Sequence, residues 1–257
     1  GSASTNATLT IGNSTNADSN YAGTIQNGST GTLAITKSGN GTLTLSGTNT
    51  YTGGTTINQG KIILNGGSLA SGTVSIANGA TLTSSGSASA GSLSLVTGSN
   101  LDLTSAGLTL SGGLTATGGN LNYTLGNTLA VTGVLTLSGT VNISLAGKFE
   151  AKVYDLLTFA SGDTTALKIT TTSLGWTITP VITGTKYSIS VTAASNDLNW
   201  NLSSDGTWDN STADNWYNGK TSSTQAFADG DNVTFDKSTG GFITITNTVT
   251  PKGVTVN

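Results

Sequence analysis

The first half of the chain alternates apolar and polar residues in short segments that are separated by glycine. Ten such segments lie between residues 31 and 143: GTLAI (31–35), GTLTL (41–45), GKIIL (60–64), GTVSI (72–76), GSLSL (91–95), AGLTL (106–110), GGLTA (112–116), GNLNY (119–123), GVLTL (133–137) and GTVNI (139–143). This period of two is typical of half-buried strands, and helical spacing is nowhere sustained. The pattern predicts an all-β protein.

A longer period overlies these segments. Gly41, Gly60, Gly79 and Gly98 are evenly spaced along the chain, and Gly118 and Gly139 continue at nearly the same interval. Three short strands with tight corners would fill each interval, which predicts a parallel β-solenoid with rungs of about 20 residues. An antiparallel β-sandwich is the alternative, since it also alternates strands with glycine turns.

In a solenoid, the apolar positions stack inside from rung to rung and the hydroxyl residues face solvent. The residues predicted to point inward are Leu33, Leu43, Leu45, Ile62, Leu64, Val74, Leu93 and Leu95. Like charges about 4.8 Å apart on successive rungs would repel, which explains why charged residues are rare here. The outward positions mix Ser, Asn, Ala and Thr, so no long uninterrupted hydroxyl array, and no ice binding, is expected.

The chain changes character near residue 147. Only Asp18, Lys37, Lys61 and Asp102 are charged before it, and all other charged residues follow it. We predict solenoid rungs over 1–147 and a β-rich cap or bridging section over 148–194, with a hairpin that turns near Gly184. Residues 195–257 are predicted to hold a Trp/Asp-containing block and then strands that restart a solenoid.

Charge and composition exclude several classes of function. The net charge is −3, with nine lysines and neither arginine nor histidine, which argues against nucleic-acid binding. No basic amphipathic segment or apolar run of about 20 residues occurs, so no membrane insertion of this segment is expected. The absence of cysteine excludes disulfides and thiolate chemistry.

No enzyme activity is expected, and no catalytic or cofactor-binding residue is assigned. Glycoside cleavage needs two carboxylates about 5 to 9 Å apart, and Asp18 and Asp102 are too distant in sequence to share a rung. A histidine-dependent triad is impossible, because the chain has no histidine.

Two features of the C-terminal block carry candidate chemistry. Asp229, Asp231 and Asp236 offer oxygen ligands that Ca²⁺ prefers, although an Asp-Gly turn with capping carboxylates explains the same residues, and no metal site is assigned. Trp208 and Trp216 could form an exposed platform for a sugar ring, or could be buried for their large apolar area.

The run TKSGNGTLTLSGTNTYTGGTTINQGKIIL, within residues 35–65, resembles the autotransporter-associated β-strand repeat, also called the passenger-associated transport repeat. The matching residues are Lys37, Gly39, Gly41, Thr42, Leu43, Leu45, Asn49, Thr50, Tyr51, Gly53, Gly54, Thr55 and Gly60. The section GTWDNSTADNW…FADGDNVTFD is similar to a companion block found between such repeats. The resemblance implies a right-handed β-helical passenger that is exported through the outer membrane of a Gram-negative-type bacterium and displayed or shed. The family's membrane-embedded C-terminal barrel has no expected counterpart in 148–257.

These observations favour a structural, extracellular β-solenoid segment of a bacterial surface protein, acting as a spacer, stalk or fibre element that aids export. Two alternatives stay open. One is an adhesin that binds carbohydrate or another surface ligand through residues 198–236. The other is a fibre subunit that assembles head-to-tail with copies of itself, because both ends of the chain resemble unpaired solenoid edges.

Overall fold

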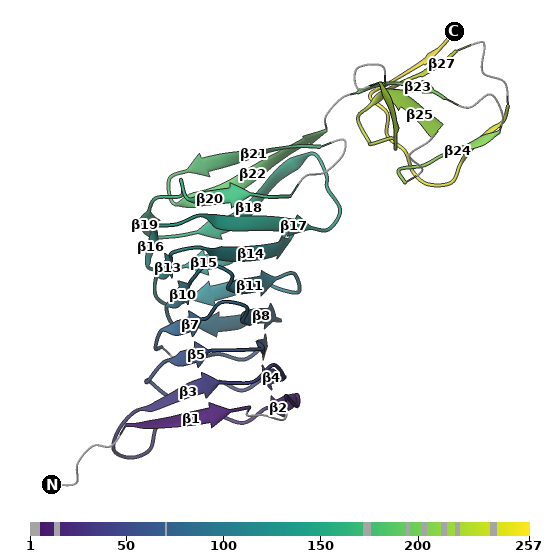
Figure 1. Cartoon of the computed structure of the whole chain (residues 1–257). Coiled ribbons are helices and arrows are strands. Elements are labelled where there is room, and N and C mark those ends of the chain that lie inside the picture. Colours follow the sequence, from purple (N-terminus) through teal and green to yellow (C-terminus); the bar gives the residue numbers. More distant parts are fainter. Residues whose placement is uncertain are drawn as a thin grey trace. The chain divides into compact units, whose positions relative to one another are not determined.

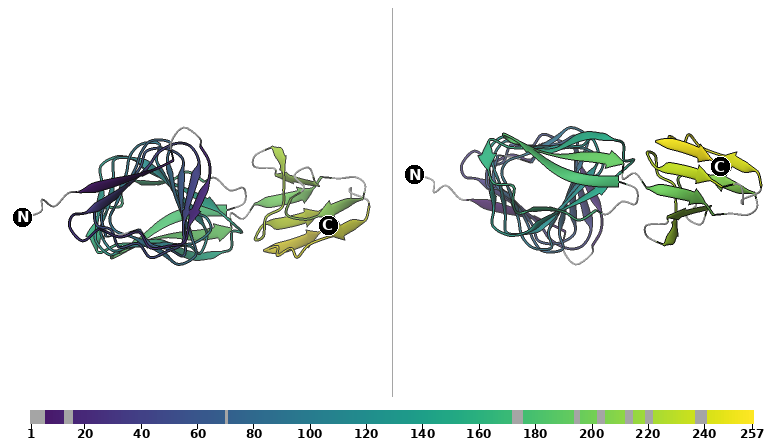
Figure 2. Two further views of the ribbon diagram at one scale, coloured as in Figure 1. Left: turned by 90° about the horizontal axis from the view of Figure 1, so that it is seen from below. Right: turned by 90° about the horizontal axis from the view of Figure 1, so that it is seen from above.

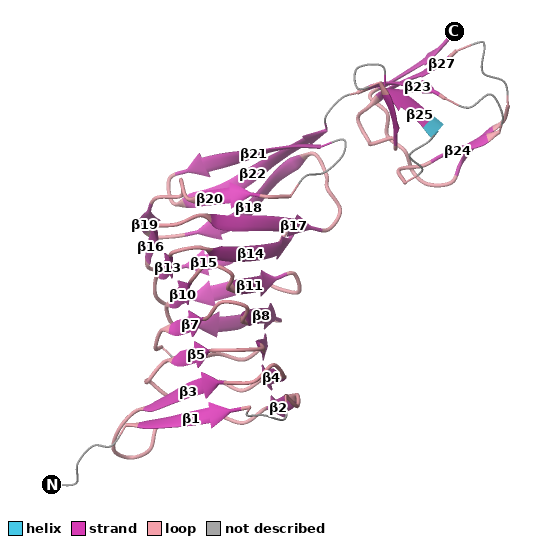
Figure 3. Ribbon diagram, in the orientation of Figure 1, coloured by secondary structure: helices cyan, strands magenta, loops and turns pink. Residues whose placement is uncertain are grey.

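The computed structural model describes residues 6–12, 16–69, 71–171, 176–193, 196–201, 205–211, 215–218, 222–236 and 241–257. The chain divides into two compact units (Figure 1). The solenoid unit comprises Gly1–Lys148, Tyr154–Thr171 and Pro180–Ile189. The C-terminal unit comprises Phe149–Val153, Thr172–Thr179 and Ser190–Asn257. Strands dominate both units (Figure 3).

Two parallel sheets of eight strands run the length of the solenoid unit. Sheet A contains, in order, β1 (Ala7–Ile11), β3 (Leu33–Lys37), β5 (Thr55–Ile57), β7 (Val74–Ile76), β10 (Leu93–Leu95), β13 (Leu114–Ala116), β16 (Val134–Leu137) and β19 (Ser161–Gly162). Sheet B contains β2 (Ser19–Tyr21), β4 (Thr42–Leu45), β6 (Lys61–Asn65), β8 (Thr81–Ser85), β11 (Asn100–Leu103), β14 (Gly119–Thr124), β17 (Val141–Ala146) and β20 (Leu167–Ile169). The chain alternates between the two sheets, so consecutive coils stack, as the end-on views show (Figure 2).

A third sheet closes the later coils. Sheet C contains, in order, β21 (Trp176–Thr183), β22 (Lys186–Ala193), β18 (Lys152–Thr158), β15 (Leu129–Val131), β12 (Leu108–Leu110) and β9 (Ala88–Ala90). Before β9 this side of the coil is reduced to single parallel bridges that join Thr48 to Ser68 and Ser68 to Ser89. The three-strand coil predicted from the glycine spacing is therefore complete only from β9 onward.

The strand register confirms the predicted coil length. Thr55 pairs with Val74, Val74 with Leu93, and Leu93 with Leu114, so each coil returns to the same sheet position after about 20 residues. Coils near the two ends are longer, as the pairing of Ala7 with Leu33 and of Leu129 with Leu157 shows. The sequence therefore predicted a parallel β-solenoid correctly, and the sandwich alternative is wrong.

The glycine period marks one corner of the coil. Gly41, Gly60, Gly79, Gly98, Gly118 and Gly139 all lie just before the start of a sheet B strand. Gly60 has a φ of +68°, and a Cβ there would lie 2.6 Å from the Gly39 and Gly41 carbonyl oxygens. At Gly139 a Cβ would lie 2.2 Å from the Thr117 oxygen. The corner therefore needs glycine both for its backbone conformation, as at Gly60, and because the preceding coil approaches closely.

The aliphatic residues predicted to face inward form a continuous core. Leu45, Leu64 and Val74 are fully buried and Leu93 is 1% exposed, since each strand is covered by one above and one below. Leu33 is the exception and is only half-buried. It pairs with Ala7 of β1, which is exposed, so among the described residues little covers it on that side.

Solenoid strands continue beyond residue 147. β18, β19 and β20 extend sheets C, A and B respectively, each paired in parallel with the preceding strand of its sheet. The predicted hairpin is present as β21 and β22, joined at Gly184, which has a φ of +58°. In sheet C, β22 adds to β18, so the hairpin covers the end of that sheet. Residues 172–175 lie outside the described residues.

The C-terminal unit combines parallel and antiparallel strands. One sheet contains, in order, β26 (Ser223–Gln225), β25 (Trp216–Asn218), β23 (Asp197–Trp200), β27 (Asn232–Phe235) and β29 (Gly253–Val256), and a second pairs β24 (Gly206–Trp208) with β28 (Ile243–Ile245). The β23–β27–β29 and β24–β28 pairings are parallel, in keeping with the solenoid strands expected here. The antiparallel pairing of β25 with β23 and β26 was not predicted.

Candidate functional site

Lys37 of the repeat motif points into the solenoid core and not toward solvent. It is 2% exposed and stacks between Ile11 and Ile57 in sheet A. Its ammonium donates hydrogen bonds to the carbonyl oxygens of Gly39, at 2.7 Å, and Ser38, at 3.0 Å. Burial lowers the pKa of Lys37, and the negative charge of Asp18 partly opposes this. The aliphatic stem of Lys37 therefore packs in the core, while its ammonium is hydrogen-bonded to carbonyl oxygens at a corner of the coil. The expectation that charges are avoided because they repel between coils did not predict a buried lysine.

Asn49 joins three consecutive coils. Its Oδ1 accepts a hydrogen bond from the Ile25 backbone N–H at 2.8 Å, in the preceding coil. Its Nδ2 donates to the Gly47 carbonyl oxygen in its own coil and, at 2.6 Å, to the Ser68 carbonyl oxygen in the next. The side chain is 4% exposed. This position therefore fixes the corner after sheet B.

Tyr51 and Thr55 complete the buried part of the motif. Tyr51 is fully buried, Thr55 is 3% exposed, and their hydroxyl groups are hydrogen-bonded to each other. At Gly53, a Cβ would lie 2.6 Å from the Leu33 carbonyl oxygen, so only glycine fits. The Tyr51 and Thr55 side chains therefore contribute to the packing of the coils.

Residues 35–64, which contain all of these positions, match the family model of the passenger-associated-transport-repeat. The repeat covers the coil from β3 to β6, and its characteristic residues are those that turn the corners and hold neighbouring coils together. The repeat family implies an exported, surface-displayed protein, and the β-solenoid fold agrees with an autotransporter passenger segment. A comparison of the chain with functionally curated proteins found no match.

The tryptophans of the C-terminal block form a core and not an exposed platform. Trp200, Trp208 and Trp216 are 5%, 6% and 0% exposed, and they pack with Leu198, Phe227 and Val233. The Trp216 ring lies 5.0 Å from Trp200 and 5.3 Å from Trp208 between centroids, in edge-to-face contacts. The interpretation of Trp208 and Trp216 as a sugar-stacking platform is therefore wrong, and the alternative of burial holds. Residues 202–204, 212–214 and 219–221 of this block lie outside the described residues.

The three candidate calcium ligands occupy different surroundings. Asp231 is fully buried, and its carboxylate accepts hydrogen bonds from the Asn196 and Ala228 backbone N–H groups at 2.8 and 2.9 Å. Burial raises the pKa of Asp231, and these donors only partly counter it. Asp229 accepts from the Thr250 N–H at 2.9 Å, and Asp236 is exposed.

The acidic segment is a turn, as the alternative interpretation predicted. The Asp231 N–H donates to the Ala228 carbonyl oxygen at 3.0 Å, and Gly230 has a φ of +95°. Within the part of the chain that the structure describes, no three acidic side chains converge as a metal site would require.

The two acidic residues of the first 147 are far apart in the solenoid. Asp18 lies just before β2, and Asp102 lies in β11. These strands are four steps apart in sheet B, roughly 19 Å at the spacing of paired strands. The two carboxylates therefore do not share a rung, as the sequence indicated.

The outward face of sheet A carries a row of hydroxyl side chains, here called the hydroxyl file, that the sequence analysis did not predict. The register places hydroxyl residues at equivalent positions of successive coils: Thr10, Thr36, Thr56, Ser75, Ser94, Thr115 and Thr136. The expectation that no long array occurs is therefore wrong. This expectation failed because the coils differ in length, so the equivalent positions can be recognised only from the strand register. Sheet B bears a shorter amide ladder, in which Asn120 and Asn142 donate to the side-chain oxygens of Asn100 and Asn120.

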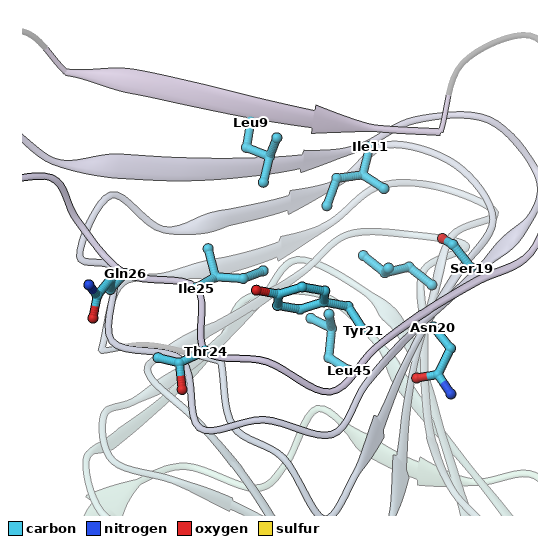
Figure 4. A pocket seen from close by; sticks show the side chains of 10 residues that line it. Leu9, Ile11, Ser19, Asn20, Tyr21, Thr24, Ile25, Gln26 and Leu45 are labelled. Atoms are coloured by element: carbon cyan, nitrogen blue, oxygen red, sulfur yellow. The ribbon is translucent and has the colours of Figure 1, made fainter.

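The N-terminal end of the solenoid opens onto a cavity of about 550 Å³ (Figure 4). Leu9 and Ile11 of β1 and Tyr21 of β2 line it, together with Ile25 and the core residue Leu45. Leu9 and Tyr21 are 41% and 46% exposed, although they are paired with Ile35 and Leu45, which are almost fully buried. The cavity thus lies at the first described strands of sheets A and B, on the inward side of the stack.

Proposed function

We propose that this chain is a structural spacer, which sets the reach and stiffness of an exported passenger. The observation that carries the proposal is the continuity of sheets A and B, each paired in parallel through eight strands. A continuous ladder ties every coil to its neighbours, and a solenoid lengthens by about 4.8 Å with each added coil.

The character of the surface supports this role. The outward hydroxyl file is suited to water, the side chains of the amide ladder are hydrogen-bonded to one another, and Lys37, Asn49, Tyr51 and Thr55 of the motif are buried. No helix among the described residues is long and apolar enough to span a membrane.

The first test changes the number of coils. Deletion of residues 75–93 removes one complete coil and lets Leu95 and Leu101 take the places of Ile76 and Leu82. We expect a folded chain whose solenoid is shorter by about 4.8 Å in small-angle scattering, with a melting temperature within a few degrees of the parent. Deletion of residues 75–84 is the matched control, because it removes half a coil, breaks the register and should unfold the later coils.

The second test separates a spacer from an adhesin. A variant with Thr56, Ser75, Ser94 and Thr115 replaced by alanine alters the outward file without touching the core. Parent and variant should show equal, non-saturable retention on glycan and extracellular-matrix arrays, and equal display of the passenger on cells. Saturable binding by the parent that the variant loses would assign this face to ligand recognition and overturn the proposal.

A further inference from the structure

We propose that Asn27 is a site of spontaneous deamidation, in which the backbone nitrogen of Gly28 attacks the side-chain amide of Asn27. Asn–Gly pairs recur along the chain, and in four of them the structure describes both residues: Asn27–Gly28, Asn40–Gly41, Asn65–Gly66 and Asn78–Gly79. Among these four, the pair at Asn27 combines a free nucleophile with hydrogen bonds to the reacting amide. This chemistry is independent of the spacer role, since a chain that lacks it could act as a spacer equally well.

The reaction needs no reactant other than water. The Gly28 nitrogen loses its proton and forms a bond to Cγ of Asn27. The bond from Cγ to Nδ2 then breaks, Nδ2 leaves as ammonia, and a succinimide ring remains. Water opens the ring at either carbonyl group, and the product is aspartate or isoaspartate. In isoaspartate the main chain runs through the side-chain carbon.

The Gly28 amide is free to act as the nucleophile. Gly28 is exposed in the loop between β2 and β3, and among the described residues its N–H has no hydrogen-bond acceptor. A Cβ at Gly28 would meet no atom within 4 Å, so open space surrounds this part of the backbone. Water can therefore take the proton of this amide, and the glycine backbone has the freedom to turn its nitrogen toward Cγ.

Two backbone N–H groups contact the oxygen that gains charge in the reaction. Asn27 Oδ1 accepts hydrogen bonds from the Leu33 N–H at 2.8 Å and from the Thr52 N–H at 3.1 Å. Oδ1 becomes an oxyanion when the Gly28 nitrogen attacks Cγ, and donors that already point at it stabilise that charge, as in an oxyanion hole. The strengthening of these two hydrogen bonds is worth roughly tenfold in rate.

Thr52 also contacts the nitrogen that leaves. Asn27 Nδ2 donates a hydrogen bond to Thr52 Oγ1 at 2.9 Å. A hydroxyl group donates as well as accepts, and Nδ2 becomes basic once the attack has removed its conjugation with the carbonyl group. The Thr52 hydroxyl is thus positioned to give its proton to the departing ammonia, and to regain one from solvent, because Thr52 is exposed.

The Asn–Gly pairs of two later corners lack a free nucleophile. At Asn65–Gly66 the glycine N–H donates to the Ser85 carbonyl oxygen at 2.7 Å. At Asn78–Gly79 it donates to the Gly98 carbonyl oxygen at 3.0 Å. Both acceptors lie in the following coil. Hydrogen bonding to a neighbouring coil therefore protects these two pairs.

The pair Asn40–Gly41 lacks the donors. Asn40 is exposed, and no group among the described residues donates a hydrogen bond to its side-chain oxygen. Gly41 is buried against the preceding coil, where a Cβ would lie 2.5 Å from the carbonyl oxygens of Asn16 and Ala17. We therefore expect Asn40 to react more slowly than Asn27.

Deamidation to isoaspartate would remove a link between neighbouring coils. Asn27 binds the N–H groups of Leu33, at the start of β3, and of Thr52, which lies before β5 in the next coil. The aspartate product keeps an acceptor oxygen near both donors. Isoaspartate lengthens the main chain and moves the acceptor, so hydrogen exchange at the Leu33 and Thr52 amides should become faster.

Incubation of the full chain in mildly alkaline buffer, followed by denaturation and trypsin digestion, tests the proposal. Cleavage after Lys37 and Lys61 places Asn27 and Asn40 in separate peptides and leaves Asn65 and Asn78 in a third. Mass spectrometry then gives the deamidation rate of each asparagine. We expect Asn27 to react roughly tenfold faster than in an unstructured synthetic peptide of residues 22–32. Asn65 and Asn78 should react more slowly than in the corresponding peptides.

Variants at Gly28 and Thr52 separate the two parts of the mechanism. Gly28→Ala should fold normally, because its Cβ meets no atom, and should deamidate more slowly, because the Cβ obstructs ring closure. Thr52→Val removes the hydroxyl but keeps the backbone N–H, and should slow the reaction by a smaller factor. Thr52→Ser retains the hydroxyl and is the matched control, with the rate of the parent. Circular dichroism verifies that each variant is folded.

The peptide comparison decides the proposal whether or not every variant folds. An Asn27 rate in the folded chain at or below that of the synthetic peptide overturns it. Rates at Asn65 and Asn78 that equal the rate at Asn27 overturn it as well, since the surroundings would then have no effect. A folded Thr52→Val variant that reacts at the rate of the parent overturns the role of the Thr52 hydroxyl.

Discussion

The solenoid unit and the C-terminal unit bury their apolar residues in two different ways. In the solenoid, one aliphatic column is repeated coil after coil, and each side chain contacts its equivalents above and below. In the C-terminal unit, three tryptophans and Phe227 form a single cluster in which each ring has different neighbours. A repetitive core divides its stability among neighbouring coils, whereas an aromatic cluster concentrates it in a few residues.

The distribution of tryptophan allows the two units to be followed separately. Trp200, Trp208 and Trp216 all belong to the aromatic cluster of the C-terminal unit, and the fourth tryptophan, Trp176, lies in the hairpin strand β21. In a Trp176→Phe background, tryptophan fluorescence therefore reports the C-terminal unit alone, while far-UV circular dichroism reports both. The stability experiments below use this background.

The largest effect is expected for Leu45→Asp in the solenoid. Leu45 is fully buried between Tyr21 and Leu64, so the variant places an unpaired charge in the stack and should cost about 4 to 5 kcal/mol. Denaturation should show early loss of the N-terminal coils by circular dichroism, with unchanged tryptophan fluorescence. Thr44→Asp, at the outward neighbouring position, should cost less than about 1 kcal/mol. Equal melting of Leu45→Asp and the parent would contradict the core assignment.

Trp216→Ala should affect the other unit by a similar amount. The Trp216 ring contacts Trp200, Trp208, Phe227 and Phe235, and its removal should cost about 3 to 5 kcal/mol. The fluorescence transition should move to lower denaturant while the solenoid signal is retained. Tyr217→Ala, on the next residue with 36% exposure, is the control and should shift neither transition. Simultaneous loss of both signals would show that the units unfold as one.

Asn49→Ala tests whether the repeat motif stabilises the stacking of coils. The variant removes acceptor and donor groups that serve Ile25, Gly47 and Ser68, and we expect a loss of about 1 to 3 kcal/mol. Hydrogen exchange should increase at the Ile25 amide before it does in the later coils. Asn58→Ala, at an exposed position just after β5, should leave exchange unchanged.

The smallest expected effect is that the stability of the two units depends on pH with opposite sign. Because burial raises the pKa of Asp231, the folded C-terminal unit binds more protons than the unfolded chain above pH 3.8, so acidification toward that value should stabilise it. In the solenoid, burial alone would also raise the pKa of Asp102. Hydrogen bonds from Thr104 and Thr83 outweigh burial and hold the pKa of Asp102 below 3.8. The solenoid should therefore lose stability as the pH falls below that value.

Fluorescence-detected unfolding at neutral pH and at a pH just above the ordinary aspartate pKa checks the first half of this prediction. Asp231→Asn should remove the gain in stability that the C-terminal unit shows on acidification. A gain that persists in this variant would assign the effect to another group.

Most of the solenoid could be predicted from the sequence, because its determinants are local and repeated. Alternation of apolar and polar residues identifies strands such as TLTL (42–45), and the regular glycine period identifies the corner before sheet B. The motif within residues 35–65 indicated the repeat family whose model matches residues 35–64. The same reasoning correctly placed the Gly184 hairpin and the Asp-Gly turn at 228–231.

The tertiary structure decided what depends on alignment between coils and on burial. The burial of Lys37 against corner carbonyl oxygens follows from the stacking of the coils and not from its place in the sequence motif. Trp208 and Trp216 lie in a polar stretch, and only the convergence of β24, β25 and β27 reveals that they form a core. The hydroxyl file likewise arises from pairing between strands that lie a full coil apart in the chain, because contacts at that separation follow from the three-dimensional register and not from any local pattern.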